Sequence, residues 1–448
     1  MDHDKAKEPI LNRRLLLFLA AMAFAEAART MTMVQVPIFL RELGANIQQI
    51  GLFFTISMVF PLLLRVIGGW LSDTIGRLRA LTIGSIAGVL TYLSFSIAPT
   101  WQAALLGPAF LAITSALIFP SYKAFIADQT PEHAQGRVFG ISETIITIAW
   151  IAGPPLGGLL AESLGYRAMF IAATISFTIA AGIFSRMARQ SRALEEQPQR
   201  PNFESLRRSL THLFALMMAG GLVTWILIVD GVRDVAFKLS FDLMPIYLTE
   251  IGHLSKSQIG LMDGLFGIAL ALTTLPAGWL VDKTSERVGI SLGLIIMVLS
   301  RLVFAVAGAF WGFAGSWILL GIGGGLLDPA GSSLIAKGVP RKVRGLTYGL
   351  VATSLGILSL PAPWIGSQIW KILDPQAPFL LTVVLGSLAI IPAWIKLVLP
   401  EKVPQGSAVA FTQLRFEKGN TAGGTYAQRA QERYYRSRSH SSRPFERE

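Results

Sequence analysis

The stretch GGWLSDTIGRLRAL, Gly68–Leu81, places one aspartate and two arginines between two long apolar runs. A second version, AGWLVDKTSERVGI, begins at Ala277, 209 positions later. The match extends on both sides: QIGL at Gln49 recurs at the same offset, and VLTYLSFSIA from Val89 matches VLSRLVFAVA from Val298. Polar loops repeat here together with apolar segments, so a chance likeness of apolar helices does not explain the match. The chain therefore consists of two repeats.

The composition predicts a membrane protein. The chain has 448 residues, of which 52% are hydrophobic and 15% charged, and its mean hydropathy is +0.54. Apolar runs recur that are long enough to cross about 30 Å of hydrocarbon as a helix. Because the bilayer offers no water to unpaired backbone groups, runs of this length must be helical, whereas β-barrel strands would be shorter and alternating. We therefore expect an all-α membrane protein.

The apolar windows predict twelve transmembrane helices in two pseudo-symmetric six-helix halves. Upstream of the repeat described above, VPIFLRELG from Val36 matches MPIYLTEIG from Met244 at an offset of 208, which indicates a one-residue insertion. The expected spans are 13–40, 48–72, 79–98, 101–124, 137–161, 166–186, 213–248, 257–281, 288–309, 311–336, 345–370 and 376–398. They define a cytoplasmic N-terminus (1–12), an N-terminal bundle (13–186), a cytoplasmic linker (187–212), a C-terminal bundle (213–399) and a disordered cytoplasmic tail (400–448).

The distribution of Lys and Arg predicts the orientation. These residues concentrate in the linker and in alternate loops, whereas the loops on the other side hold only Arg41, Arg167, Lys256 and Lys371. By the positive-inside rule, both termini and the linker are cytoplasmic, in the plasma or inner membrane. The net charge of +12 then decorates the inner membrane face, so it does not require a nucleic-acid partner.

Several classes of chemistry find no support in the sequence. The chain has no cysteine, and its five histidines are scattered, so we expect no metal site and no cofactor. No G-x-x-x-x-G-K-[ST] motif is present, so ATP is not the expected energy source. We also find no clustered nucleophile and base, and we expect a monomer that is not an enzyme.

The first copy of the repeated loop resembles a known motif. Gly69, Asp73, Gly76, Arg77 and Arg79 match G-x-x-x-D-x-x-G-R-x-R, which is typical of the loop between the second and third helices of the major facilitator superfamily. The chain resembles this superfamily over essentially its whole membrane region. The resemblance implies a secondary transporter whose two halves rock about a site near the membrane midplane.

By this resemblance, the loop is a conformational latch that closes the cytoplasmic side. Asp73 is expected to face the eleventh helix near residues 344–348, and Arg77 is expected to reach Asp128 at the end of the fourth span. The second copy keeps Asp282 but has Ser285 and Glu286 where the motif has Gly and Arg. We therefore expect the second latch to be weaker.

The fifth span contains GPPLGG, with Gly153, Pro154, Gly157 and Gly158 in the positions of a G-P-x-x-G-G pattern. Within the superfamily, this pattern is associated with exchangers and drug exporters. Proline removes a helix donor and the glycines permit close packing, so a kinked and closely packed helix is expected. Ordinary small-residue packing between membrane helices is the alternative.

Charged residues inside the spans are the candidates for substrate and proton binding, because such residues are costly in a membrane and tend to face a cavity or a partner. Glu26 and Arg29 lie three residues apart in the first span. Asp234 corresponds to Glu26 at the offset of 208. The cavity residues proposed from the sequence are Glu26, Arg29, Asp230, Arg233, Asp234, Lys238 and Asp328.

The functional hypothesis is that Glu26, Asp230 or Asp234 exchanges a proton and that a neighbouring cation shifts its equilibrium. The alternative is a structural ladder of ion pairs within the seventh span. Arg301 has no explanation at this stage, because it lies on a helix expected to be peripheral and corresponds to Tyr92.

These observations together predict a transporter that moves a small molecule by alternating access, with proton-coupled export as the leading form. Its partners would be the lipid bilayer, a small-molecule substrate and protons. Proton-coupled or facilitated uptake of a metabolite, including an anionic one, is an alternative. A non-transporting membrane receptor of the same fold is a further alternative.

Overall fold

The computed structural model describes residues 12–131, 134–191, 221–339, 347 and 356–399, with the side chains of 65–75 and 191 excepted. The chain divides into two compact units, Met1–Val398, which holds all the helices below, and Leu399–Glu448. The expected tail and most of the expected linker therefore lie outside the described residues. The helices of the first half are α1 (Arg13–Met33), α2 (Val36–Glu42), α3 (Ile47–Ile75), α4 (Arg77–Ile97), the short 3₁₀ helix η1 (Ala103–Leu105), α5 (Leu106–Gln129), α6 (Gln135–Ser163) and α7 (Tyr166–Ser191).

The helices of the second half follow the same plan. They are α9 (Leu222–Phe241), α10 (Met244–Glu250), α11 (Lys256–Lys283), α12 (Glu286–Val306), α13 (Phe310–Gly338), α15 (Ala362–Ile372), α16 (Ala377–Leu388) and α17 (Ile390–Lys396). In the part of the chain that the structure describes, ten helical segments are long and apolar enough to cross a membrane. The all-α membrane fold is thus confirmed, but the count of twelve spans is not.

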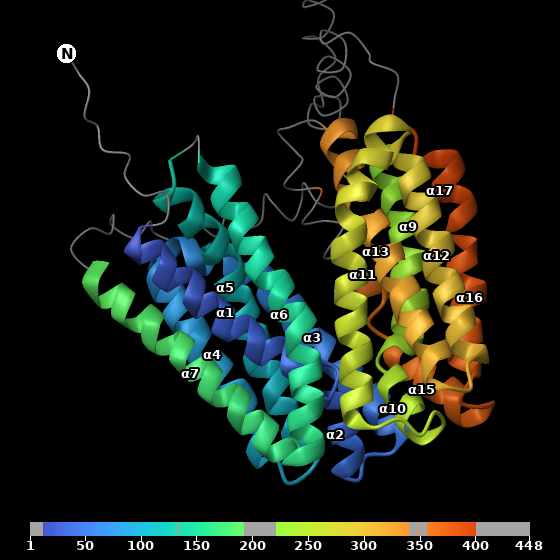
Figure 1. Ribbon diagram of the computed structural model, residues 1–448, viewed down its shortest axis with the longest axis horizontal. Helices are drawn as coiled ribbons and strands as arrows, with labels where there is room; N and C mark the ends of the chain where they lie inside the picture. Colours follow the sequence, from blue (N-terminus) through green and yellow to red (C-terminus); the bar gives the residue numbers. More distant parts are fainter. Residues whose placement is uncertain (1–11, 132–133, 192–220, 340–346, 348–355, 400–448) are drawn as a thin grey trace, which may run out of the picture. The chain divides into compact units, whose positions relative to one another are not determined.

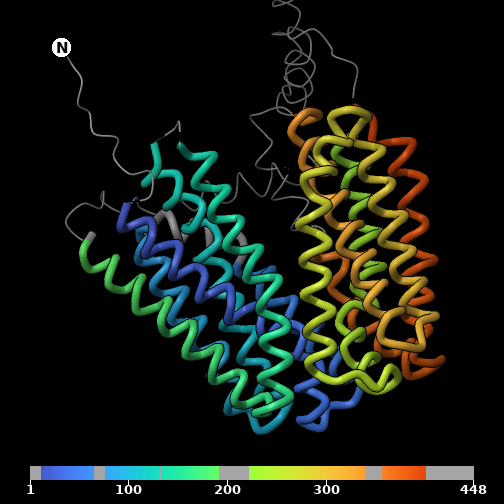
Figure 2. The backbone as a smooth tube through the Cα atoms, in the orientation of Figure 1, coloured from blue at the N-terminus to red at the C-terminus, as the bar shows by residue number. Residues whose placement is uncertain are grey.

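Each half forms its own helical bundle (Figures 1 and 2). In the first, α4 packs against α5 and α7, and α1 packs against α6 and α7. In the second, α13 packs against α11 and α12, while α16 packs against α9 and α12. The two bundles meet along α6 and α11 and along α3 and α15. Helix α3 is the equivalent of α11, and α6 is the equivalent of α15. The two contacts therefore join the same pair of helix positions with the halves exchanged, as the sequence repeat requires.

Two expected spans are divided in the structure. The span predicted at 13–40 is interrupted after Met33, and the span predicted at 213–248 is interrupted between Phe241 and Met244. The helix that follows each break begins with proline near its first position, Pro37 in α2 and Pro245 in α10. Proline has no N–H to continue the preceding helix but fits the first turn of a new one. The break is therefore built into both repeats.

Other boundaries shift by shorter distances. Helix α7 continues to Ser191, past the expected start of the linker at 187. The last expected span, 376–398, is divided into α16 and α17 at Ala389. Of the span expected at 345–370, the structure describes α15 and the residues just before it.

The repeated QIGL sequence starts two helices in the same way. In α3, the Asn46 side chain accepts from the backbone N–H of Gln49, whose own side chain accepts from the N–H of Asn46. In α11, Ser255 and Gln258 form the same reciprocal pair. Both are capping boxes, which satisfy N–H groups that a helix start leaves free. The sequence repeat is therefore also a repeat of local structure.

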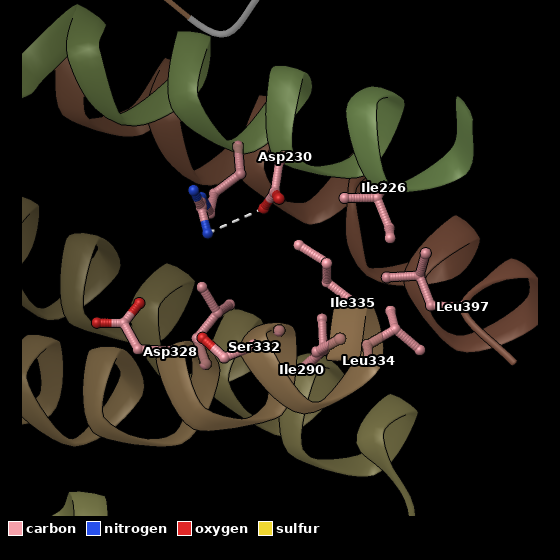
Figure 3. A pocket seen from close by; sticks show the side chains of 11 residues that line it. Ile226, Asp230, Ile290, Asp328, Ser332, Leu334, Ile335 and Leu397 are labelled. Atoms are coloured by element: carbon pink, nitrogen blue, oxygen red, sulfur yellow. Dashed lines mark ion pairs between the residues drawn. The ribbon is translucent and has the colours of Figure 1, made fainter. Parts of the chain in front are cut away.

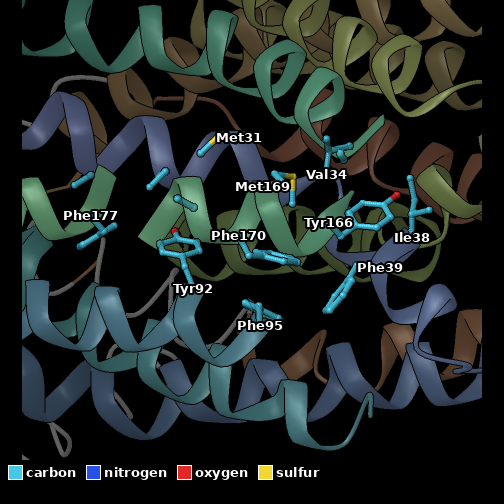
Figure 4. Close-up of a cluster of buried hydrophobic side chains, with 14 of the residues drawn as sticks. Met31, Val34, Ile38, Phe39, Tyr92, Phe95, Tyr166, Met169, Phe170 and Phe177 are labelled. Atoms are coloured by element: carbon cyan, nitrogen blue, oxygen red, sulfur yellow. The ribbon is translucent and has the colours of Figure 1, made fainter. Parts of the chain in front are cut away.

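Aromatic side chains fill the core of each bundle near the short helices α2 and α10. In the first, the rings of Phe39 and Phe95 lie 6.4 Å apart, and Phe170 packs against both (Figure 4). In the second, the equivalent rings of Tyr247 and Phe304 lie 5.2 Å apart. Burial of such rings and their tilted contacts stabilise each half separately.

Candidate functional site

Two adjoining cavities are lined by the second bundle, with Met33 of α1 added to the wall of the second, and they share Arg233, Leu327 and Asp328. Arg233 comes from α9 and Asp328 from α13, which are the seventh and tenth expected spans, and α12 also contributes to the walls of both cavities. Five of the seven cavity residues proposed from the sequence meet here. They are Asp230, Arg233, Asp234, Lys238 and Asp328.

The first cavity, of about 170 Å³, holds an ion pair at its polar edge. The Nη1 atom of Arg233 lies 3.0 Å from Oδ1 of Asp230, one helical turn earlier on α9. Figure 3 shows this pair on α9, with Asp328 and Ser332 on α13. The rest of the wall is apolar, with Ile226, Ile290, Leu334, Ile335 and Leu397 among its residues. Asp230 is thus partly neutralised within its own helix, as the ladder hypothesis predicts.

The second cavity, of about 370 Å³, combines apolar walls with five charged residues. Lys238 lies over the ring of Phe241, with its Nζ 5.7 Å from the ring centre. No ion pair involves Asp234 or Asp328 among the residues whose placement the structure gives. The charged residues are Arg233, Asp234, Lys238, Arg301 and Asp328, and the apolar ones include Met33, Phe237, Phe266, Leu270, Met297 and Leu320.

Arg301 is the residue at this site that sequence reasoning did not explain. Its side chain is 0% exposed, although α12 was expected to be peripheral. The guanidinium carbon lies 5.1 Å from the ring centre of Phe237, at the edge of the second cavity. An arginine inside an apolar span was the available signal, but its direction depends on the rotation of α12, which one sequence does not give.

Glu26 and Arg29 form a separate pair on α1. Arg29 donates from Nη2 and Nε to Oε2 of Glu26, at 2.6 and 2.9 Å. Glu26 is 6% exposed, and the guanidinium carbon of Arg29 lies 4.9 Å from the ring centre of Trp150 on α6. Neither residue lines the two cavities. The structure therefore does not bring this acid together with those of α9.

Of the first latch, the structure describes Gly76, Arg77 and Asp128. Gly76 joins α3 to α4 with a φ of 87°, which favours glycine. Arg77 pairs with Asp128 on α5 and donates to the carbonyl oxygen of Ala124 at 2.9 Å. The side chains of Gly69 and Asp73 and the expected partner segment 344–348, apart from Thr347, lie outside the described residues.

The second copy of the loop holds the same contact with its charges reversed. Glu286 stands at the position equivalent to Arg77, and Lys337 at the position equivalent to Asp128. Their side chains lie 2.7 Å apart, and Ser333 donates to Glu286 at 2.9 Å. Asp282 lies 3.8 Å from Lys337. The paired exchange keeps an ion pair at this position, and the weaker second latch stays a prediction.

The residues of the GPPLGG pattern lie in α6, where this helix contacts α1 and α11. A Cβ atom on Gly153 or Gly157 would collide with Thr30 or Met31 of α1, and one on Gly158 would collide with Lys256 and Ser257 of α11. A Cβ atom on Gly260 of α11 would likewise collide with the carbonyl oxygen of Pro154. The motif thus lets α6 pack tightly against one helix in its own half and one in the other.

Polar contacts join the two halves at one end. Arg41 pairs with Glu250 at 2.5 Å, and Lys256 pairs with Glu42 at 2.7 Å. Lys371 donates to Gln48 at 2.8 Å. Arg41 and Glu250 lie on α2 and α10, the equivalent short helices of the two repeats, in which Glu42 corresponds to Glu250 at the offset of 208. The end that the Lys and Arg distribution predicts to be external is therefore closed by contacts between the halves.

Comparisons with known proteins agree with this architecture. The family model described as Major Facilitator Superfamily matches residues 18–241 and 232–420. Multidrug resistance protein MdtG of Salmonella heidelberg is 25% identical, over 80% of this chain and 88% of that protein. A Na⁺, Li⁺, K⁺/H⁺ antiporter of Planococcus maritimus is 25% identical, over 72% and 82%. A bacterial homologue of the human lysosomal transporter Spinster superposes with a TM-score of 0.65 at 14% identity, covering 87% and 97%.

Proposed function

Because the chain belongs to the major facilitator superfamily, we propose that it is a proton-coupled exporter of small amphipathic molecules that works by alternating access. The coarser statement, that it is an integral membrane protein of a secondary-transporter family, follows from the family match and the membrane-spanning helices. Membership in a transporter family favours transport over catalysis as its activity. In our proposal the protein acts as a monomer with both termini in the cytoplasm.

The observation that carries this proposal is the second cavity. Asp234 and Asp328 reach it from α9 and α13, and neither has an ion-pair partner within the described part of the chain. An acid without a cationic partner binds a proton more readily than one held in a salt bridge. The apolar wall around these acids suits a substrate with an apolar body. We assign Asp234 and Asp328 as the groups that exchange protons.

The paired acids take a different role in this proposal. Glu26 is held by Arg29, and Asp230 is held by Arg233. Breaking either pair would leave a charge without a partner in a membrane, which is unfavourable. We assign these two pairs to the structure and to the electrostatic background of the site.

Alternating access explains the arrangement at the ends of the bundles. The contacts around Arg41 and Glu250 close the external end, and we propose that they break when that end opens. The contact between Arg77 and Asp128 belongs to the latch at the other end, where we also place Gly69, Asp73 and Asp282. In this proposal, Pro154 and Gly158 pack against α11 at the surface about which the halves turn, and Gly153 and Gly157 hold α6 against α1 of its own half.

One observation favours a second candidate function. Arg233, Lys238 and Arg301 give the second cavity three cations against two acids, which suits an anionic metabolite. Uptake of such a metabolite driven by a proton gradient would use the same groups. The direction of proton movement when the compound is added to one side distinguishes uptake from export.

Proton movement in proteoliposomes tests the proposed function. Lipophilic cations, neutral drugs and small organic anions are added, and the internal pH is followed with a trapped dye. We expect at least one class of compound to move protons, and we expect Asp234→Asn and Asp328→Asn to reduce this signal to that of empty liposomes.

The matched control is Glu143→Gln. Glu143 is an exposed acid within α6 that lines neither cavity, so its neutralisation should leave proton movement unchanged. Compounds that cross the membrane without proton movement, in the unmodified protein, would contradict proton coupling. Proton movement that survives both aspartate substitutions would contradict the assignment of these two acids.

A further inference from the structure

Arg301 is a fully buried cation that has no hydrogen-bond or ion-pair partner among the residues whose placement is described. All three of its guanidinium nitrogens lack a hydrogen-bond partner among the described residues, and its side chain is 0% exposed. A guanidinium carries five N–H donors and stays charged in proteins. Buried charges are normally paired, because their removal from water is unfavourable. A group that is not among the described side chains must therefore pair with the Arg301 guanidinium.

The comparison of the two repeats shows that only the second half carries an arginine at the position of Arg301. Its equivalent in the first half is Tyr92, and the equivalent of Arg29 in the second half is Phe237. The first half thus keeps its cation on the first helix of the repeat, beside Glu26. The second half has an aromatic ring there and carries the cation on α12, where it lies over that ring.

This difference between the repeats leaves one acid, Asp234, and one cation, Arg301, without an ion-pair partner among the described residues. Asp234, the equivalent of Glu26, has lost the cation that pairs with Glu26 in the first half. Arg301 lies at the edge of the cavity, and no described acid pairs with it there. Asp234 and Asp328 line the same cavity, yet no ion pair links either of them to Arg301. The cavity therefore carries separate positive and negative groups on an apolar wall.

We infer that Arg301 binds the carboxylate of the transported molecule, and that the substrate class is an aromatic or aliphatic carboxylate with an apolar body. A guanidinium binds a carboxylate through two parallel hydrogen bonds. The side chains of Phe241, Phe266 and Met297 provide the apolar contacts for the body of the molecule. Phe237 holds the guanidinium plane by stacking before the ligand arrives.

The other charges of the cavity are consistent with this assignment. Arg233 is held by Asp230. Lys238 and Arg301 each lie over an aromatic ring, but Lys238 is partly exposed whereas Arg301 is fully buried with no hydrogen-bond partner among the described residues. The inference rests on the proposed function only in taking this cavity as the substrate site. It does not depend on proton coupling or on the direction of transport.

The test compares ligands that differ only in their polar group. 2-Naphthylacetate, 2-naphthylacetamide and 2-(2-naphthyl)ethylamine are titrated into the purified full-length protein in detergent, and naphthalene fluorescence anisotropy reports binding without transport. We expect the carboxylate to bind roughly 10-fold or more tightly than the amide, in line with a hydrogen bond to a charged group. Arg301→Met should remove this preference and leave the affinity for the amide nearly unchanged.

Two further variants make the result specific. Arg301→Lys keeps the charge but not the paired donors, so it should keep part of the preference. Arg287→Met removes an arginine from the same helix at its end, where it stacks on Trp394, and should not change the preference. Arg301→Met should fold, because it replaces an unpaired buried charge with an apolar chain; its thermal unfolding is measured to verify this. If Arg301→Met does not fold, the partial preference of Arg301→Lys decides.

The outcomes separate this inference from the proposed function. If the unmodified protein does not prefer the carboxylate, or if Arg301→Met retains the preference, the inference is wrong even where proton movement is observed. The second result would fit an arginine that pairs with an acid in another conformation. A carboxylate preference that depends on Arg301, in a protein that moves no protons, would support the inference and contradict proton coupling.

Discussion

At the scale of single residues, the exchange of charges between the repeats is the most informative feature. The pair of Arg77 and Asp128 in the first half is replaced by Glu286 and Lys337 in the second, with the signs reversed and the contact kept. Both changes are visible in the sequence, but each looks like the loss of a motif residue when it is considered alone. Only the contact between the two positions shows that one change compensates for the other.

This exchange predicts the behaviour of a charge swap in the first half. Arg77→Glu alone and Asp128→Lys alone place like charges together, and each should slow transport and lower the thermal unfolding temperature. The double variant reproduces the arrangement of the second half, so it should recover most of the transport rate and most of the thermal unfolding temperature. Because the two side chains are partly exposed, we expect a coupling free energy of only about 0.5–1 kcal/mol. A double variant no better than the worse single one would contradict this account of the contact.

Residue spacing predicted some of the site and not the rest. The three-residue spacing of Glu26 and Arg29 places them on one helix face, and they are indeed paired. Asp230, Asp234 and Lys238 follow one another at intervals of four residues, a spacing that places them along one helix face, and all three line the cavities. Arg301 could not be placed, because the orientation of α12 is set by its packing against α13 and α16 and not by its own sequence.

At the scale of helices, proline and glycine decide where the elements bend and touch. The sequence predicted one span over 13–40 and another over 213–248, and both are divided. The prolines that begin α2 and α10 were a visible signal, and their equivalence in the two repeats makes it stronger. The close approach of α6 to α1 is likewise set by small residues, since a side chain at Gly157 would collide with the backbone of Met31.

Alanine substitutions along α6 test this view of helix packing. Gly157→Ala should lower stability by about 1–3 kcal/mol, because the added methyl group meets backbone that cannot move aside. Gly140→Ala lies in the same helix and adds its methyl group to open space. It should be neutral or slightly stabilising, since alanine favours a helix more than glycine does. Thermal unfolding in detergent measures both; equal effects would show that the glycines are not needed for close packing.

At the scale of the whole molecule, the sequence repeat predicted two equivalent bundles, and the structure contains them. The loop charges predict which end is external, and this orientation stays a prediction. The sequence could not predict that this end is closed, because that depends on contacts between side chains of different halves, such as Arg41 with Glu250 and Lys256 with Glu42. These contacts are partly exposed and individually weak, so the closed end can open at a modest free-energy cost. Such a balance is what alternating access requires.

The absence of natural cysteine permits a direct test of whether the closed end must open during transport. Arg41→Cys and Glu250→Cys are combined, so that the only two thiols of the protein flank the contact at the closed external end. A short bifunctional thiol reagent with a reducible link is added to proteoliposomes, and transport of a compound identified by proton movement is followed. Each single-cysteine variant, treated in the same way, serves as the control.

We expect the cross-link to form readily in the double variant, to stop transport, and to release it when a reductant is added, while the single variants transport throughout. This result would mean that the external end must open in every transport cycle. Undiminished transport by a fully cross-linked protein would contradict alternating access about the site in the second half.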